Sequence, residues 1–194
     1  MANEKKLDGV ILGLLSHQDK TGYEVKERVD STLRRFWGAS FGSIYPTLKE
    51  LVSNEVATKV ESVDHGRKKL TYSITEKGRQ HLKLWLMRPV EKDEIRYETL
   101  LKLFFGESTG PAVTGLHIAG FESRIKAEIP FLEASIAELT TILDVDAAHL
   151  FYLLTAKFGL KVFSAYLEWA AETKEILAAH GLASTGEDEK ATSH

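Results

Sequence analysis

The stretch FGSIYPTLKELVSNEVATKVESVDHGRKKLTYSIT, residues 41–75, decides the fold because a helical period gives way to a strand period within it. Its first part has apolar residues at helical spacing: Phe41, Ile44, Leu48, Leu51 and Val52. Pro46 is tolerated only in the first turn of a helix, where its missing amide has no intrahelical acceptor. A helix is therefore predicted to begin near Ser43, with one face in the core and the other free to meet a partner.

The second part of the stretch alternates as a β-hairpin does. Apolar and β-branched residues are predicted to share a face on each strand: Val56, Thr58 and Val60 on the first, and Leu70, Tyr72 and Ile74 on the second. Three consecutive cations lie near the tip, at residues 67–69. Such a run adds no packing, so it is either a solvated turn or a wing that lies along a phosphate backbone. We favour the wing.

The residues before this stretch predict two more helices. The first, up to about His17, has its core stripe at Leu7, Val10, Ile11, Leu14 and Leu15. The second begins at a capping box, in which Thr21 and Glu24 satisfy each other's backbone amides. Its inward side chains are expected to be Tyr23, Val29 and Leu33. Three helices followed by two strands make a helix-turn-helix with a wing.

The chain after the hairpin is predicted to be helical. Thr75 caps a fourth helix, whose buried stripe is Leu82, Trp85 and Leu86 and which Pro89 ends. Residues 100–105 are apolar almost all round, which predicts burial on more than one side. The fold class is therefore expected to be mostly α (α+β), with an N-terminal winged helix-turn-helix and a C-terminal α-helical region.

Two long helices are predicted next, one from about Pro111 and one over about residues 147–182, with Gly181 ending the second. The first, with an expected kink at Pro130, has a heptad seam that we assign to dimerisation: Ile125, Ile129, Leu132, Ile136, Leu139 and Leu143. The helices either fold back on the winged helix or pack across a two-fold axis. We favour a homodimer, because two heads on a pseudo-palindromic operator must lie about one DNA turn (roughly 34 Å) apart.

Four blocks of sequence, in order, point to a family: ILGLL at residues 11–15, TGYE at 21–24, GSIYPTLKEL at 42–51 and YSITEKG at 72–78. With them the chain resembles the PadR family of bacterial transcriptional regulators. YLEW at 166–169 is similar to the larger PadR subfamily, which has a helical C-terminal dimerisation region. The family commonly has Gly after its third helix, where this chain has Glu55 and Val56, and we expect only a local change in that turn.

The composition predicts a globular, cytoplasmic protein. Of 194 residues 43% are hydrophobic, and neither a run of roughly 18 apolar residues nor a signal-peptide apolar segment is present, so no membrane partner is expected. The absence of cysteine excludes disulfides and thiolate metal sites. Residues 1–90 carry 16 Lys and Arg against 11 Asp and Glu, net +5, whereas residues 91–194 carry 9 against 17, net −8. Only the N-terminal half suits double-stranded DNA.

Candidate DNA contacts come from the second helix, the third helix and the wing: Thr21, Tyr23, Ser43, Tyr45, Thr47, Lys49, His65, Arg67, Lys68 and Lys69. A helix N-terminus can take a phosphate, the first turn of the third helix can enter the major groove, and wing cations can neutralise phosphates. Tyr45 lies only about 70° from the centre of the apolar stripe, so a half-buried structural role stays open. Capping alone also explains Thr21.

No catalytic residue, metal site or cofactor is expected, because the histidines are scattered and no phosphate loop or nucleophile elbow is present. The family resemblance implies a phenolic or other planar effector, or none. Aromatic residues with one histidine are the candidates for its site: Phe104, Phe105, Phe121, Tyr166, Trp169 and His117. Ordinary core packing also explains these aromatics.

These observations predict a homodimeric DNA-binding repressor that a small-molecule effector releases from its operator. The domains expected are residues 1–90, a winged helix-turn-helix; residues 91–183, a helical dimerisation and effector domain; and residues 184–194, a disordered acidic tail. Two alternatives are a transcriptional activator and a protein-interaction module whose winged helix no longer binds DNA.

Overall fold

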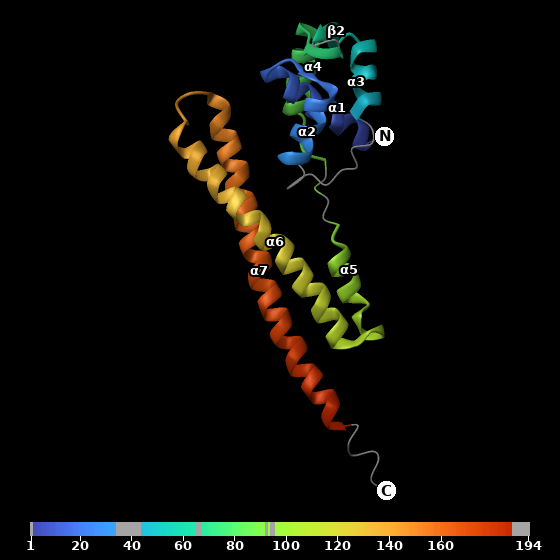
Figure 1. Ribbon diagram of the computed structural model, residues 1–194, viewed down its shortest axis with the longest axis vertical. Helices are drawn as coiled ribbons and strands as arrows, with labels where there is room; N and C mark the ends of the chain where they lie inside the picture. Colours follow the sequence, from blue (N-terminus) through green and yellow to red (C-terminus); the bar gives the residue numbers. More distant parts are fainter. Residues whose placement is uncertain (1, 34–43, 65–66, 92, 94–95, 188–194) are drawn as a thin grey trace. The chain divides into compact units, whose positions relative to one another are not determined.

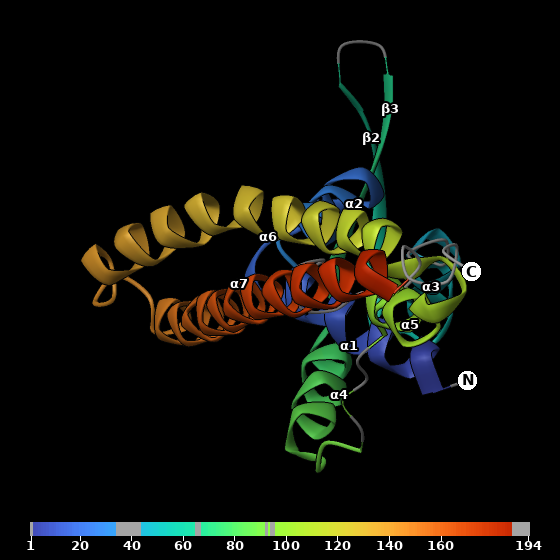
Figure 2. The same ribbon diagram turned by 90° about the horizontal axis from the view of Figure 1, so that it is seen from below.

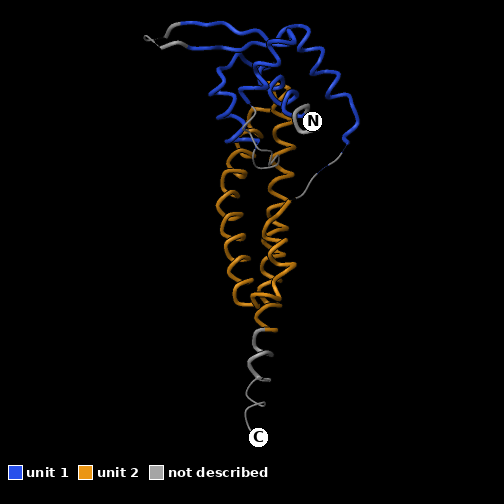
Figure 3. Tube along the Cα trace, turned by 90° about the vertical axis from the view of Figure 1, so that its right-hand side faces the viewer, with its two compact units in different colours: residues 1–93 blue, residues 94–194 orange. Residues whose placement is uncertain are grey.

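The chain forms two compact units, residues 1–93 and 94–194 (Figure 3). The computed structural model describes residues 2–33, 44–64, 67–91, 93 and 96–187. The first unit contains α1 (Ala2–His17), β1 (Lys20–Thr21), α2 (Gly22–Ser31), α3 (Ile44–Ser53), β2 (Ala57–Asp64), β3 (Arg67–Ile74) and α4 (Glu76–Met87). The second contains α5 (Glu98–Phe104), the 3₁₀ turn η2 (Gly106–Ser108), α6 (Gly110–Thr141) and α7 (Ala147–Glu187) (Figure 1). The predicted fold class is confirmed.

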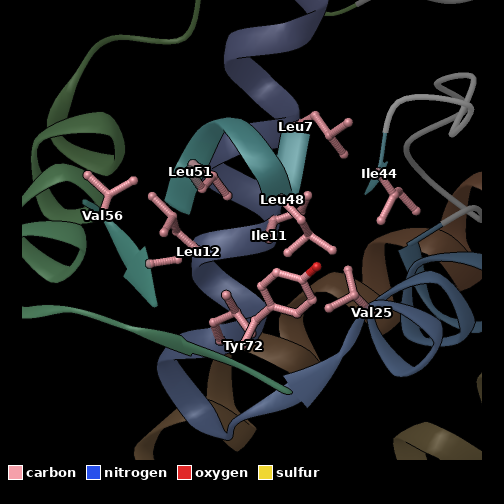
Figure 4. Close-up of a cluster of buried hydrophobic side chains, with 11 residues drawn as sticks. Leu7, Ile11, Leu12, Val25, Ile44, Leu48, Leu51, Val56 and Tyr72 are labelled. Carbon is pink, nitrogen blue, oxygen red and sulfur yellow. The ribbon is translucent and has the colours of Figure 1, made fainter. Parts of the chain in front are cut away.

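The core of the first unit lies where α1, α2, α3 and the sheet meet (Figure 4). Its fully buried side chains come from all three helices: Ile11, Leu12, Leu15, Val25, Val29, Ile44, Leu48 and Leu51. Each of these aliphatic side chains contributes about 2 kcal/mol when removed from water. Tyr72 of β3 is buried against them. The third helix is thereby held rigidly, with one face in the core.

In the helices of the first unit, two residues predicted for the core are exposed instead. Tyr23 is 67% exposed, because the inward stripe of α2 is formed by Gly22, Val25 and Val29. Leu86 is 65% exposed, one residue beyond Trp85, whose ring lies directly over Gly9 of α1. The capping box of α2 and the Thr75 cap of α4 are confirmed by their hydrogen bonds.

The three-stranded antiparallel sheet has the order β1-β3-β2. Directly opposed residues share a face, and here Ala57, Lys59 and Glu61 of β2 oppose Ile74, Tyr72 and Leu70 of β3. The predicted face of β2 is therefore wrong, and Val60 is 61% exposed. Val56 is buried, but it precedes the strand, so alternation begins at Ala57.

The turn between α3 and β2 explains this shift of one residue. Glu55 adopts the left-handed conformation, with φ of 61°. Its N–H donates to the Val52 carbonyl at 3.0 Å, and the Val56 N–H donates to the Leu51 carbonyl at 3.0 Å. These two bonds form a Schellman motif, with Val56 and Leu51 as its apolar contact. The turn thus has the shape that a glycine favours, although a glutamate occupies it.

Helices α6 and α7 lie side by side in the second unit (Figure 2). Ile125 and Leu132 are buried in one cluster with Ala156 and Phe163 of α7, and Ile129 and Ile136 pack against that cluster. Helix α7 of the same chain therefore covers the seam from Ile125 to Ile136, and the assignment of the whole seam to dimerisation stays a prediction. An antiparallel helix pair satisfies such a seam as well as a second copy does.

The ends and interruptions of these helices also differ from the expectation. Helix α6 runs unbroken through Pro130, and α7 continues past Gly181 to Glu187. A single glycine inside a long helix costs only about 1 kcal/mol relative to alanine, which does not end it. Residues 188–194, most of the predicted disordered tail, lie outside the described residues.

Helix α7 has a second, uncovered apolar face. Phe151, Leu154 and Phe158 follow one another at helical spacing and are 65%, 56% and 65% exposed. By length and composition alone, residues Ala147–His180 would also suffice to cross a membrane, with a mean hydropathy of 1.3 over their most apolar window. Only 11% of that window is buried, so the second unit itself does not cover this face of α7.

Candidate nucleic-acid interface

The outer face of α3 differs in one residue from the prediction. Tyr45 and Lys49 are exposed, as expected of side chains that meet DNA, and Tyr45 is 55% exposed. Thr47 is only 5% exposed, so its assignment as a base-reading residue is wrong. It follows Ile44 by three residues and therefore falls on the buried stripe. Ser43 lies outside the described residues.

Tyr45 has a structural contact as well as an exposed edge. A Cβ atom added to Gly22 would come within 2.6 Å of Cε1 of Tyr45. The ring therefore lies directly over the backbone of α2, and only glycine leaves room for it there. Gly22 and Tyr45 join the second helix to the third and fix the direction in which the phenol projects.

The N-terminus of α2 brings three predicted residues close to one another. The Thr21 N–H donates to Glu24 Oε2 at 2.6 Å, and the Thr21 hydroxyl donates to the same oxygen at 2.8 Å. These bonds, with the nearby cations Lys69 and Lys20, hold the pKa of Glu24 below its usual 4.5. Lys69 of the wing therefore lies near the start of α2, two residues along β3 from Thr71, the cross-strand partner of Thr21.

The wing projects from the first unit as a hairpin of β2 and β3 (Figure 2). Lys69 is exposed on β3. Arg67 and Lys68 also belong to β3, but their side chains lie outside the described part of the chain, as does all of His65. The assignment of these three residues to DNA stays a prediction.

A cleft of about 320 Å³ lies between α3 and the hairpin. Its lining residues come from three elements: Lys49, Val52 and Ser53 of α3, Lys59 of β2 and Tyr72 of β3. Lys59 is absent from the predicted contacts. The alternation of β2 could have predicted it, because Lys59 shares a face with the buried Ala57. That face is recognised only when the strand is taken to begin at Ala57.

Some candidate effector residues cluster in the second unit. Phe121, Tyr166 and Trp169 pack against one another, with ring centroids 5.7 Å apart for both Phe121 pairs. Tyr97, which is not among the predicted residues, joins them through a 2.6 Å hydrogen bond between its hydroxyl and that of Tyr166. Burial raises the pKa of Tyr97 far above its usual value, so this phenol stays protonated.

The remaining candidates do not join this cluster. Phe104 and Phe105 contact each other, with ring centroids 5.1 Å apart, but are 81% and 62% exposed. His117 lies close enough to Glu98 on α5 to help lower the pKa of that carboxyl, after the dominant effect of Lys102. The exposed Phe104 and Phe105 fit an intermolecular surface better than a small-molecule site.

Two family profiles match consecutive parts of the chain. The profile described as "Transcriptional regulator PadR-like family" matches residues 11–84, the winged helix. The profile described as "Virulence activator alpha C-term" matches residues 95–178, the helical unit. The chain belongs to the PadR family. PadR proteins are transcriptional regulators, not enzymes, as the sequence predicts.

Two bacterial transcriptional regulators extend the likeness. "Probable transcriptional regulator Rv1176c" of Mycobacterium tuberculosis is 27% identical over 187 residues, covering 88% of this chain and 97% of that protein. "Negative transcriptional regulator PadR" of Bacillus subtilis is 33% identical over 98 residues, 49% of this chain and 53% of the relative. The crystal structure of B. subtilis PadR in complex with operator DNA superimposes on this chain with a TM-score of 0.73 and 26% identity. The match covers 88% of this chain and 98% of the PadR chain.

The Vibrio cholerae virulence activator AphA is 27% identical in its solved structure, with a TM-score of 0.68 and coverage of 90% and 99% of the two chains. This PadR-family fold therefore occurs in proteins named as negative regulators and as activators. The fold alone does not fix the sign of regulation.

Proposed function

We propose that this PadR-family protein is a homodimeric repressor that binds a pseudo-palindromic operator in the cytoplasm. DNA binding is supported by one observation: the first unit, which has a net positive charge, contains both the helix α3 and a projecting hairpin. Repression is supported by the B. subtilis relative, which is named a negative regulator. Base reading would rest on α3, and affinity on phosphate contacts of the wing and of the start of α2.

The proposed dimer uses the uncovered apolar faces of the second unit. Five large apolar side chains are exposed within one chain: Phe104 at the end of α5, Phe105 directly after it, and Phe151, Leu154 and Phe158 on α7. Soluble proteins rarely leave so many aromatic side chains in water, and a stable interface needs about 800 Å² from each partner. A two-fold axis through these faces would pair two reading heads.

An effector site at the cluster of Tyr97, Phe121, Tyr166 and Trp169 is a second part of the proposal. A crystal structure of B. subtilis PadR holds p-coumaric acid, a phenol. In this chain, the paired hydroxyls of Tyr97 and Tyr166 offer a hydrogen-bonding group that a phenolic ligand could engage among aromatic rings. Titration with p-coumaric acid, followed by tryptophan fluorescence of Trp169 against a Trp169→Phe control, tests it.

Fluorescence anisotropy with duplex DNA from upstream of the chain's own gene tests operator binding. Affinity should fall steeply with salt, and Arg67→Ala with Lys68→Ala should weaken binding to all sequences by the same factor. Lys83→Ala with Lys157→Ala removes the same charge from exposed sites on α4 and α7 and is the matched control. No binding by the wild-type chain at low salt would rule out the repressor and favour a protein-interaction role.

A further inference from the structure

The cleft between α3 and the hairpin is lined by two lysines that form no ion pair within the described part of the chain. Lys49 and Lys59 line it from opposite sides, and neither forms an ion pair with any described residue. Val52 provides an apolar wall, and Ser53 and Tyr72 line the remainder. Two lysines on the lining of one cleft bring like charges near each other, and an anion between their ammonium groups would be attracted by both.

The register of the sheet explains why Lys59 reaches this cleft. Lys59 is the direct cross-strand partner of Tyr72, on the face of the sheet that packs against the helices. A lysine in this position covers apolar surface with its stem and places its ammonium group at the rim. Lys49 approaches the same rim from the exposed face of α3.

We propose that this cleft binds one phosphate of the DNA backbone between Lys49 and Lys59. The proposal rests on the DNA-binding function proposed above and adds a contact residue, Lys59, to it. The Ser53 hydroxyl is a neutral donor for the same phosphate, whereas Tyr72, buried in the core, only lines the cleft.

The geometry of a duplex favours a backbone phosphate at this place. A helix that reads the major groove and a wing that meets the next minor groove lie on opposite sides of one sugar-phosphate backbone. That backbone must therefore pass through the angle between α3 and the hairpin. The cleft lies in this angle, since it is lined by α3, β2 and β3 together.

The salt dependence of DNA binding tests the contact directly. Each phosphate contact contributes about 0.9 to the slope of log K against log salt, so Lys59→Gln in both protomers of a dimer should reduce the slope by about 1.8. Affinity at 0.1 M salt should fall on the order of 10-fold for each phosphate that is no longer neutralised, equally for operator and unrelated DNA. Lys59→Arg should restore the slope, and Lys83→Gln, on exposed α4 surface, is the matched control.

Three outcomes overturn the proposed phosphate site. If Lys59→Gln and Lys83→Gln give the wild-type slope while the wild-type chain binds operator, the DNA-binding function stands and the role of the cleft in it fails. If the wild-type chain binds no DNA, both fail together. In the third outcome, inorganic phosphate at constant ionic strength raises the midpoint of thermal unfolding of the wild type but not of Lys59→Gln. If the two proteins also have the same slope of log K for DNA against log salt, the cleft binds free anions and not the DNA backbone.

Discussion

At the residue scale, Glu55 shows how one backbone position shapes the reading unit. A non-glycine residue in the left-handed region costs about 1–2 kcal/mol, and this chain accepts that cost after its third helix. The Glu55 carboxylate forms an ion pair with Lys77 at 3.1 Å, in which the Glu55 side chain is 82% exposed. Exposed pairs of this kind are worth about 0–1 kcal/mol, so the pair does not offset the strain in full.

Glu55→Gly should therefore stabilise the first unit by about 1 kcal/mol, because glycine adopts this conformation without steric strain. Thermal unfolding followed by circular dichroism should show the midpoint rising by about 4 °C. Glu55→Gln is the matched control: it removes the charge of the ion pair, keeps the strained backbone, and should change stability by less than about 0.5 kcal/mol. A glycine variant less stable than the wild type would contradict the strain account.

At the scale of elements, the pairing of α6 with α7 combines a buried seam with one ionic link. Glu122 of α6 is only 16% exposed and accepts hydrogen bonds from Lys126 at 2.8 Å and from Lys174 of α7 at 2.6 Å. The bond from Lys126, followed by that from Lys174, lowers the pKa of Glu122 from 4.5 to about 2. The carboxylate therefore ties the two helices together while it is ionised.

Acid should weaken the second unit through this carboxylate. A carboxyl whose pKa is lowered by folding stabilises the fold fully above pH 4.5, and that contribution is lost as the pH falls toward 2. Glu122→Gln should therefore flatten the dependence of stability on pH in this window, as measured by urea unfolding at about pH 6 and about pH 3. Glu172→Gln controls for the loss of one helix carboxylate. A Glu122→Gln profile that matches the wild type would show that the link is not formed in solution.

The elements themselves were largely predictable, because helix periods, caps and prolines are local signals. Three residues show where local signals end. The heptad seam around Leu132 indicates that a partner helix exists, but not which chain supplies it. Thr47 has a polar side chain, yet it lies on the same buried face of α3 as Ile44 and Leu51. Lys59 escapes prediction because the left-handed residue at Glu55 moves the start of alternation by one position, and a shift of one exchanges the two faces of a strand.

At the scale of the whole molecule, a charged substitution should have different effects on the buried and on the exposed face of the α6–α7 pair. Leu132 is 6% exposed within the chain, whereas Phe158 is 65% exposed. A charge at Leu132 is buried between α6 and α7 whatever the oligomeric state. A charge at Phe158 stays in water in one chain and is buried only in the proposed dimer.

Phe158→Glu should therefore convert the dimer to a monomer by light scattering while helical circular dichroism is retained. Operator affinity should fall on the order of 100-fold or more, because two linked heads bind far more tightly than one. Leu132→Asp should instead abolish the cooperative unfolding of the helical unit. A Phe158→Glu protein that remains dimeric would place the interface elsewhere, with the α5 surface of Phe104 and Phe105 the next candidate.

The Thr75 hydroxyl has a consequence for how such regulators can change their targets. It donates to the Glu55 carbonyl at 2.8 Å and accepts the Gly78 N–H at 3.0 Å, so one atom fastens the end of α3 to the start of α4 across the hairpin. The two ends of the segment from α3 to the start of α4, residues 44–78, are thus joined by hydrogen bonds, and we call this segment the cassette. Operator preference should be transferable by exchanging this cassette between family members, with the helical half left untouched, and a chimera that folds yet retains its old preference would refute this modularity.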